Sequence, residues 1–580
     1  DVHFGEDTAD EIAMVHELHG VESGSSGWPS RTLSHPVLGT LTVTDPADAD
    51  DANDYTSLSY DAKKPPSAQS VLQDLAFKVR VCERQASAPA FSALEYTMLN
   101  VLSEYQDILF NHRTQKNAAQ LQRAVSLHIV NHVLKTRDRV LKNASRLQVL
   151  AQQGGSPTEF RDQGFTRPRV LILTPFRHTA LSHVMSLINN GPSGLNVENR
   201  KRFMTAFGPP EESAAPVTSK PSDWHELFDG NADDCFRVGL KWTRRTVKLF
   251  SDFYSSDVLV CSPLGLRLIV GAEGDDEKLR DYDFLSSIEV LVVDRADVLS
   301  TQNWDHVVHI LSLLNRVPKS PHGCDFSRVR NWCLDGHARF ARQSIFLSDI
   351  CLPEINNVYS RSCVNFAGKL RCNPPASSLP GVLGRITRQQ QQIFHRVGCD
   401  SPAQMDEAKI EYFTTKLASS FRAGSAHGPG KHLLIVVPTY MELVLLRGAL
   451  LALDIQLVAM SEYTSGPRIA RARSMFKQGR VDVCIVTERF HFYRRLVLQG
   501  ARHVVFYALP DRPHFYKEFV EMIDPDAVSK EGRPGAVDAA QDGECTILYT
   551  KFELFRLERV VGAARARTML SSERSLHLFM

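Results

Sequence analysis

Uninterrupted apolar runs recur along the middle and the end of the chain. Residues 287–297 contain the clearest one, which runs from Ile288 to Val293 and ends in the acidic residues Asp294 and Asp297. A run without polar alternation is typical of a strand that is buried on both faces of a parallel sheet. Further runs alternate with helical segments and lie at residues 168–177, 257–261, 344–349, 433–437, 481–486 and 503–507. This alternation predicts an α/β protein with two successive doubly wound parallel sheets.

The polar and periodic segments around these runs predict a division of the chain. Residues 1–66 are acidic and polar, and we expect them to be largely disordered, as a solubilising tail or as an acidic arm that docks on a basic partner. Apolar residues at three- and four-residue steps predict a helical region, whose continuation carries Arg139, Lys142 and Arg146. The predicted divisions are 67–160 (helical region), 161–365 (first lobe, with an insertion at 189–222), 366–405 (linker with one strand) and 406–580 (second lobe).

Composition narrows the class of protein only moderately. The 580 residues have a formal net charge of +1, which argues against nucleic-acid binding through a charged tail but leaves room for local basic faces. The apolar runs are far shorter than the roughly 20 residues of a membrane span, so we expect no membrane contact. The 11 cysteines include no C-x-x-C pair, which favours a reducing compartment and gives no metal site.

Several turns after the apolar runs resemble motifs of superfamily 2 helicases. The resemblance rests on Thr174-Pro175-Phe176-Arg177, Ser262-Pro263-Leu264-Gly265, Asp294-Arg295-Ala296-Asp297 and the strand at residues 342–349. It implies a degenerate superfamily 2 helicase core, with two tandem RecA-like lobes. Asp294 to Asp297 matches the acidic Asp-Glu-Ala-Asp box of that family, in which the second acid polarises the attacking water.

Three departures from the helicase pattern predict that ATP hydrolysis is lost. The chain has no G-x-x-x-x-G-K-[ST] loop, and the interval before Val170, where we expect that loop, reads Gly-Gly-Ser-Pro-Thr at residues 154–158. Arg295 replaces the acid of the box, and residues 515–519 replace the arginine-finger motif. We therefore expect no catalytic residue, no cofactor and no metal ion, and we expect Asp294→Asn to be tolerated. The alternatives are an active ATP-dependent RNA helicase with divergent motifs, or an unrelated α/β enzyme that binds a metal through Asp294 and Asp297.

Longer phrases resemble one family more specifically. Residues 249–257, 283–289, 325–330 and 487–495 are similar to the digestive organ expansion factor family (Utp twenty-five), over roughly residues 70–575. The resemblance implies a nucleolar, helicase-like protein of the small-subunit processome, without catalysis or a small-molecule substrate. It implies pre-ribosomal RNA, the U3 small nucleolar ribonucleoprotein and other processome proteins as partners in early cleavages of pre-18S rRNA for the 40S subunit.

Basic residues and motif turns are the candidate contacts to RNA or to partners. They are Pro175, Phe176, Arg177, Ser262, Pro263, Gly265, Arg468, Arg471, Arg473, Arg489, Arg494 and Arg495. Cations beside aromatic residues, as at 489–495, are able to hold phosphates and stack bases. A solvated helix face and a packed aromatic loop explain the same pattern.

Overall fold

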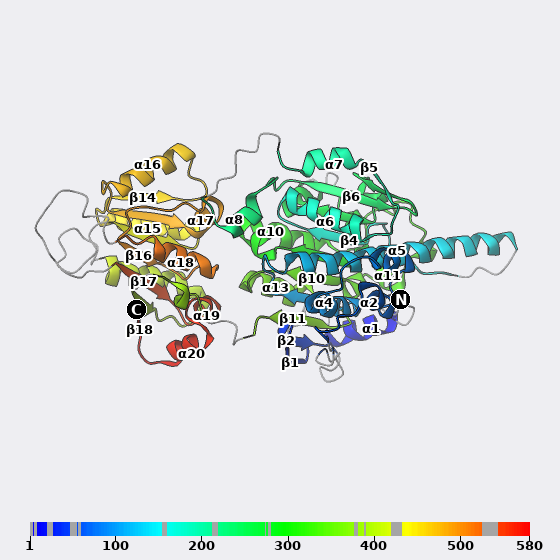
Figure 1. Ribbon diagram of the computed structural model, residues 1–580, viewed down its shortest axis with the longest axis horizontal. Coiled ribbons are helices and arrows are strands. Elements are labelled where there is room, and N and C mark those ends of the chain that lie inside the picture. Colours follow the sequence, from blue (N-terminus) through cyan, green and yellow to red (C-terminus); the bar gives the residue numbers. More distant parts are fainter. Residues whose placement is uncertain are drawn as a thin grey trace, which may run out of the picture. The chain divides into compact units, whose positions relative to one another are not determined.

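The strands and helices of the computed structural model fall into two units, Asp1–Pro375 and Ala376–Met580 (Figure 1). The structure describes residues 4, 8–19, 27–46, 55, 58, 60–153, 159–210, 219–272, 274–275, 280–375, 381–387, 390–418, 432–524 and 543–580. Each unit contains one twisted sheet with its own helices. Among the described residues no helix is both long enough and apolar enough to cross a membrane.

The first unit has an eleven-stranded sheet in the order β1-β2-β11-β3-β10-β9-β4-β8-β6-β7-β5. Its centre is parallel and contains β3 (Asp107–Phe110), β4 (Val170–Leu173), β8 (Val258–Cys261), β9 (Val290–Asp294), β10 (Gln343–Leu347) and β11 (Lys369–Asn373). Its edges contain β1 (Ser30–His35), β2 (Gly39–Thr44), β5 (Asn196–Glu198), β6 (Arg237–Trp242) and β7 (Thr246–Leu249).

Helices cover both faces of this sheet, as the sequence predicts. Val290 and Val292 of β9 pack with α5 (Ala118–Gln152) and α6 (Arg177–Asn190). Leu291 and Val293 point to the other face, because successive side chains of a strand alternate. They pack with α9 (Pro263–Val270), α10 (Ala296–Leu313) and α13 (Pro353–Ser362). The remaining helices of this unit are α1 (Thr8–His19), α2 (Ala68–Asp74), α3 (Val79–Gln85), α4 (Ala93–Ser103), α7 (Arg200–Phe207), α8 (Ser222–Phe228), α11 (Asn331–Leu334) and α12 (Ala338–Ala341).

The structure differs from the expected divisions in the first unit. Within the expected disordered segment at 1–66, residues 30–44 are instead part of the sheet, since β1 and β2 make a hairpin that pairs with β11 and buries Leu41 and Val43. The helical region at 67–160 is part of the first lobe, because it contains the central strand β3. The acidic stretch that begins at Asp45 lies largely outside the described residues.

The second unit has a seven-stranded sheet in the order β14-β15-β13-β16-β17-β12-β18, in which only β18 is antiparallel to its neighbour. The strands are β12 (Gln391–Arg396), β13 (Leu433–Val437), β14 (Leu457–Met460), β15 (Val483–Thr487), β16 (His503–Phe506), β17 (Glu544–Tyr549) and β18 (Leu576–Phe579). The helices are α14 (Met405–Tyr412), α15 (Tyr440–Ala452), α16 (Gly466–Lys477), α17 (Glu488–Arg494), α18 (Pro513–Glu521), α19 (Leu554–Val561) and α20 (Ala563–Ser571). The expected linker at 366–405 thus holds two strands, and β11 and β12 belong to different sheets.

A partly buried ion pair joins α17 to α18 in the second unit. Arg495, which follows α17 in a left-handed conformation (φ 42°), donates to both carboxylate oxygens of Glu518 at 2.6 and 2.7 Å. His491 Nε2 lies 2.8 Å from the same carboxylate. Burial alone raises the pKa of Glu518, but the hydrogen bonds from Arg495 and His491 lower it to about 2. Arg495 therefore has a structural role in the packing of these two helices.

We predict that Glu518→Gln destabilises the second unit by about 3 kcal/mol at pH 7 and by less at acidic pH. The pKa of Glu518 is depressed in the folded chain, so its stabilising effect is present above the unfolded pKa. It is lost as the pH falls from about 4.5 towards 2. Hydrogen exchange in α17 and α18 of the full chain, measured near pH 7 and near pH 3, checks this result.

Glu521→Gln on the same helix is the matched control, because Glu521 makes a half-exposed pair with Lys517 at 3.6 Å and accepts an exposed hydrogen bond from the Thr387 hydroxyl at 3.0 Å, which a Gln side chain can still accept. We expect that control to change stability by less than about 0.5 kcal/mol at either pH. An equal destabilisation by Glu518→Gln at both pH values contradicts the prediction.

Candidate functional site

The carboxyl ends of the central strands in the first unit form the edge at which α/β proteins bind ligands. β3 ends at Phe110 and α5 begins at Ala118, so residues 111–117 connect the strand to the helix N-terminus. In nucleotide-binding folds this connection is the loop that holds phosphates. The loop is therefore at 111–117 and does not lie shortly before Val170, as the sequence suggested. Residues 154–158, where we expected it, lie outside the described residues.

The connection reads Asn-His-Arg-Thr-Gln-Lys-Asn and contains no glycine. The side-chain oxygen of Asn117 accepts from the backbone N–H of Thr114 at 2.8 Å, and its amide nitrogen donates to the carbonyl of His112 at 2.9 Å. Asn117 thus bridges the loop with its own side chain. Backbone N–H groups in such a loop are the groups that hold a phosphate, and the one of Thr114 is already engaged here. Lys116 is exposed.

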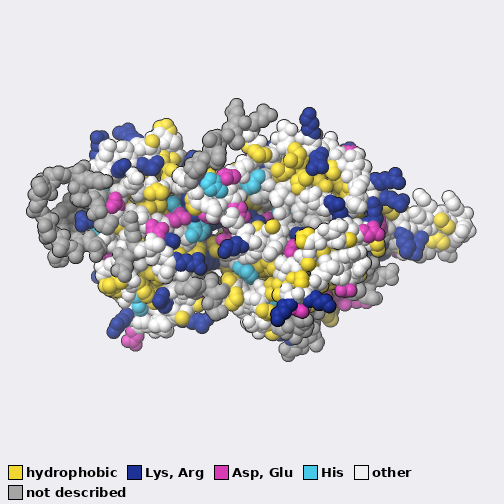
Figure 2. Space-filling model, viewed as in Figure 1, with side chains coloured by type: hydrophobic (Ala, Val, Ile, Leu, Met, Phe, Trp, Pro, Cys, Tyr) yellow, Lys and Arg dark blue, Asp and Glu magenta, His cyan; other side chains and the backbone are white. Residues whose placement is uncertain are grey.

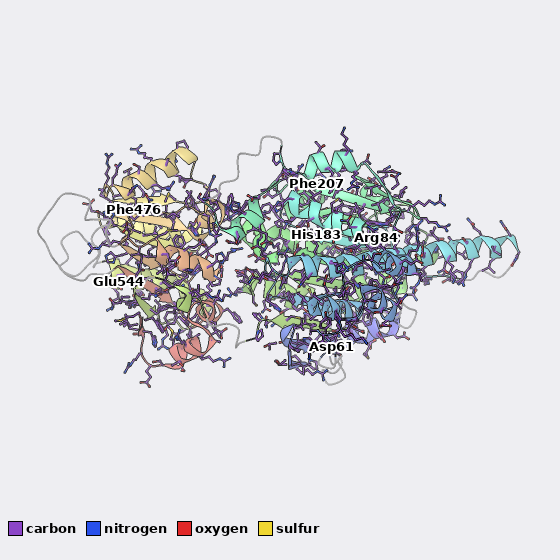
Figure 3. All side chains as sticks on the ribbon, in the orientation of Figure 1. Asp61, Arg84, His183, Phe207, Phe476 and Glu544 are labelled. Carbon is purple, nitrogen blue, oxygen red and sulfur yellow. The ribbon has the colours of Figure 1, made fainter. Side chains whose placement is uncertain are left out.

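Arg113 extends from this loop to the acidic end of β9. Its Nε lies 2.7 Å from one carboxylate oxygen of Asp294, and His183 Nε2 of α6 lies 2.8 Å from the other. The backbone N–H of Arg295 also donates to Asp294 at 3.0 Å. All four residues are buried, and Figure 3 places His183 within the first unit. Both oxygens of Asp294 therefore already have protein partners.

Charge complementarity fixes Asp294 in its ionised form. Burial alone raises the pKa of Asp294, but Arg113, His183 and Arg295 together hold it below its ordinary value. A magnesium ion needs open oxygen ligands, so an ion at Asp294 would have to displace Arg113 or His183. The residues at this edge do not fit a bound magnesium nucleotide.

Arg295, the residue that replaces the acid of the helicase box, takes part in the same network. It has a left-handed backbone (φ 57°) at the start of α10, and its guanidinium lies 2.8 Å from Glu226 of α8. Arg113 lies 3.8 Å from the same carboxylate. Asp297 accepts from the backbone N–H of Asp349 at 3.3 Å. Ala296 is fully buried, and Asp294, Arg295 and Asp297 are buried as well. The four residues of the degenerate box therefore all lie within the protein core.

The expected contact turn at 175–177 is packed against the protein. Pro175 and Phe176 are buried. Arg177 donates to the carbonyls of Ala206 and Cys235, each at 3.1 Å, and pairs with Asp233 at 3.2 Å. Its guanidinium also lies 5.6 Å from the ring centroid of Phe207, which Figure 3 labels. An RNA contact through this turn stays a prediction, and Arg177 has a packing role that the sequence did not indicate.

The second expected turn is also structural. The Ser262 hydroxyl accepts from the backbone N–H of Gly265 at 3.0 Å and so caps α9, and Pro263 begins that helix. A Cβ atom on Gly265 would lie 2.3 Å from the carbonyl oxygen of Phe236. Close packing of α9 on β6 thus requires the glycine, whatever else this turn contacts.

The candidate cations of the second unit divide into exposed and engaged residues. Arg468 and Arg471 of α16 are exposed and line a groove of about 440 Å³ together with Tyr440 and Tyr463. Arg473 is also exposed and donates to the carbonyl of Val497 at 3.2 Å. Three more cations follow β15. Arg494 is exposed, Arg489 lies 3.9 Å from Glu462, and Arg495 is buried and paired with the partly exposed Glu518.

Sequence reasoning missed Arg113, His183 and Glu226. β3 has only four residues and lies between two helices, so its pattern merged with theirs. An arginine directly after an apolar Asp-Ile-Leu-Phe run is the signal that could have indicated the site.

We predict that Arg113→Met destabilises the first unit by about 3 kcal/mol, because it leaves the buried Asp294 without its main counter-charge. Asp294→Asn should also be destabilising, contrary to the expectation from the sequence. The double variant should lose less than the sum of the two single losses, since it leaves neither charge unpaired. Tryptophan fluorescence during urea unfolding measures this effect, because all five tryptophans lie in the first unit.

Lys116→Ala in the same loop is the control, since Lys116 is exposed and a surface change usually alters stability by less than about 0.5 kcal/mol. Additive losses in the double variant would show that Arg113 and Asp294 do not depend on each other.

Solved helicase structures align with most of this chain, but only loosely. The yeast DEAD-box splicing factor Prp28 is 12% identical and covers 90% of this chain and 92% of its own, with a TM-score of 0.29. Yeast Dbp5 bound to RNA and ADP BeF3 is 13% identical and covers 87% of this chain and 94% of its own, with a TM-score of 0.27.

Sequence comparisons give a much closer relationship. The U3 small nucleolar RNA-associated protein 25 of Schizosaccharomyces pombe is 41% identical over 88% of this chain and 75% of its own length. That of Sclerotinia sclerotiorum is 38% identical over 94% of this chain and 74% of its own. The Homo sapiens homolog is 37% identical over 86% of this chain and 64% of its own.

Two family models together match most of the chain. One, the UTP25 NTP hydrolase-like domain, matches residues 105–370, which begin just before β3 and end in β11. The other, the Utp25 C-terminal domain, matches residues 382–579 of the second unit. The resemblance found in the sequence is thereby confirmed, and the chain belongs to the Utp25 family.

Proposed function

We propose that this chain is a non-catalytic, helicase-like component of the small-subunit processome. In this role it associates with the U3 small nucleolar ribonucleoprotein and pre-ribosomal RNA in the nucleolus and scaffolds early pre-18S rRNA processing. The curated relatives carry the name U3 small nucleolar RNA-associated protein 25, and their similarity extends over both units of this chain.

The observation that carries the non-catalytic part is the pairing of Arg113 with Asp294 at 2.7 Å. Phosphoryl transfer needs a carboxylate that holds magnesium and a loop that holds the triphosphate. In this chain the carboxylate is bound to Arg113 and His183, and Asn117 bridges the loop. A protein scaffold gains from such a network because it fixes β3, β9 and α6 together.

An active ATP-dependent RNA helicase is the second candidate function. The observation in its favour is Lys116, an exposed lysine one residue before the helix N-cap Asn117. A phosphate loop also carries its lysine at the start of the helix. An active helicase would need Lys116 to hold the triphosphate, whereas a non-catalytic scaffold would not need it. This difference provides the test.

We predict that the full chain has no affinity for magnesium ATP tighter than about 1 mM, and that Lys116→Ala leaves pre-18S rRNA processing unchanged. An isothermal titration with magnesium ATP measures the first quantity. Complementation of a strain depleted of the endogenous protein, with rRNA precursors detected on blots, measures the second. RNA-stimulated phosphate release that Lys116→Ala abolishes would favour the active helicase.

Association with the particle is tested separately. The exposed Arg468 and Arg471 line an accessible groove, so we propose that α16 contacts the particle through them. We predict that Arg468→Gln with Arg471→Gln lowers the fraction of the protein that sediments with U3 RNA in a sucrose gradient.

Ser474→Ala on the same helix is the control for this variant, because Ser474 is exposed but uncharged. Wild-type protein that never sediments with U3 RNA refutes the scaffold role. An unchanged gradient for the double variant refutes only the contact through α16.

A further inference from the structure

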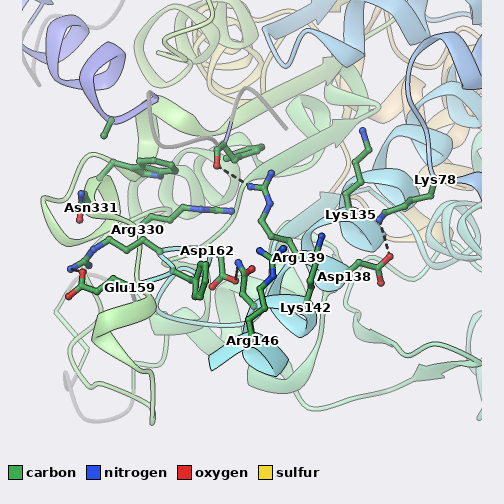
Figure 4. Close-up of a pocket in the computed structure, with 16 residues that line it drawn as sticks. Lys78, Lys135, Asp138, Arg139, Lys142, Arg146, Glu159, Asp162, Arg330 and Asn331 are labelled. Atoms are coloured by element: carbon green, nitrogen blue, oxygen red, sulfur yellow. Dashed lines mark hydrogen bonds and ion pairs between the residues drawn. The ribbon is translucent and has the colours of Figure 1, made fainter. Parts of the chain in front are cut away.

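A basic groove lies beside the outer half of α5, away from the strand edge described above. The groove measures about 800 Å³, and Figure 4 shows its lining side chains. In Figure 1 this half of α5 projects from the first unit, and in Figure 2 lysine and arginine side chains gather over it. The cations that line the groove are Lys78, Lys135, Arg139, Lys142, Arg146, Arg161 and Arg330, whereas its acids are Asp138, Glu159 and Asp162.

Each of the three acids is already engaged by a cation. Asp162 lies 2.8 Å from Arg328, which is itself buried and lies outside the groove lining. Glu159 pairs with Arg161 at 2.9 Å. Asp138 pairs with Lys78 at 2.9 Å. Arg330 also contacts the buried Glu289, so the cations of the groove that have no carboxylate partner among the described residues are Lys135, Lys142 and Arg146.

Four of these cations lie along one face of α5. Lys135, Arg139, Lys142 and Arg146 are spaced by four, three and four residues, which places them on the same side of a helix. They extend over about 16 Å of helix axis. Among the described residues, no carboxylate lies within ion-pair distance of Lys135, Lys142 or Arg146.

Two of these cations, Lys135 and Arg139, are partly buried beside other cations. Burial lowers the pKa of Lys135, and the nearby charges of Lys78 and Arg139 lower it further. Burial also lowers the pKa of Arg139, and Arg330 lowers it further, whereas Glu289 and Asp162 act in the opposite direction. Like charges held this close repel, so an anion in the groove removes an unfavourable interaction that the protein alone leaves in place.

We propose that this groove binds the phosphate backbone of a single-stranded RNA segment. Regularly spaced cations along one wall match a polyanion better than a single small anion. The half-buried ring of Phe160 lines the same groove, whereas Trp332 at its wall is buried. Cations combined with aromatic side chains are typical of grooves that hold single strands. This inference rests on the proposed function in one respect, because the proposed function names pre-ribosomal RNA as the natural source of the bound segment.

The test uses the full chain and a fluorescein-labelled oligouridine of about 20 nucleotides, which is longer than typical single-strand sites. The variant Lys135→Gln, Lys142→Gln, Arg146→Gln removes the three unpaired cations. We expect its affinity at about 50 mM KCl to fall by tenfold or more. The slope of log affinity against log salt should become shallower by about 2, since each lost contact to a single strand removes about 0.7.

The matched control is Lys63→Gln, Lys64→Gln, Lys201→Gln, which removes the same charge from exposed positions outside the groove. We expect the control to retain the wild-type affinity and slope, and thermal melts of all three proteins should agree. The same assay with duplex RNA and with a polyglutamate peptide identifies the occupant.

An unchanged salt slope in the groove variant overturns the proposal. Loss of polyglutamate binding without loss of RNA binding also overturns it and identifies an acidic protein segment as the occupant. Equal losses for duplex and single-stranded RNA overturn the assignment of a single strand. None of these results depends on sedimentation with U3 RNA, so the groove and the proposed function can fail independently.

Discussion

The ion pair between Arg113 and Asp294 is the constraint on which the rest of the first unit depends. It joins the loop after β3 to the end of β9. His183 of α6 contacts the same carboxylate of Asp294, so α6 is joined to this pair as well. These elements are far apart in the sequence and are separated in the sheet by β10. A buried carboxylate is costly unless its charge and its hydrogen-bonding capacity are both satisfied, so the three elements have to meet in one register. Removing Arg113 or His183, the partners of Asp294, should therefore affect the whole edge of the sheet.

The same arrangement occurs at the other end of β9. Glu289 directly precedes the strand and is buried, and it accepts from Arg169 at 2.7 Å and from Arg330, with His132 at 2.9 Å. Burial alone raises the pKa of Glu289, but these three partners hold it well below its ordinary value. The central strand thus has one ionised carboxylate at each end, and each is held by arginine and histidine. Apolar packing stabilises the faces of the sheet, while the two carboxylates fix where β9 begins and ends.

Sequence patterns predicted the fold class because they depend on burial, which the residue types record directly. Uninterrupted runs such as Val290–Asp294 became central strands, and the family resemblance was carried by long phrases over both units. The sequence patterns did not predict a short element when its position is determined by residues far away in the sequence. β3 has four residues, and its place in the sheet is set by β10 and β11. The pairing of Arg113 with Asp294 joins residues 181 positions apart, so no local pattern contains it. Arg177 and Arg495 were read as surface cations, but their partners lie 29 and 23 positions away.

The distribution of cations distinguishes the strand edge of the first unit from the groove beside α5. At the strand edge, Arg113 and Arg295 are neutralised by Asp294 and Glu226, so the edge has little attraction for a phosphate. Along α5, the cations outnumber the available carboxylates, and the attraction is intact. Arg330 links the groove to the amino end of β9, since it contacts Glu289 at the start of that strand and also lines the groove. An anion bound in the groove would therefore act on an arginine that helps to position the central strand.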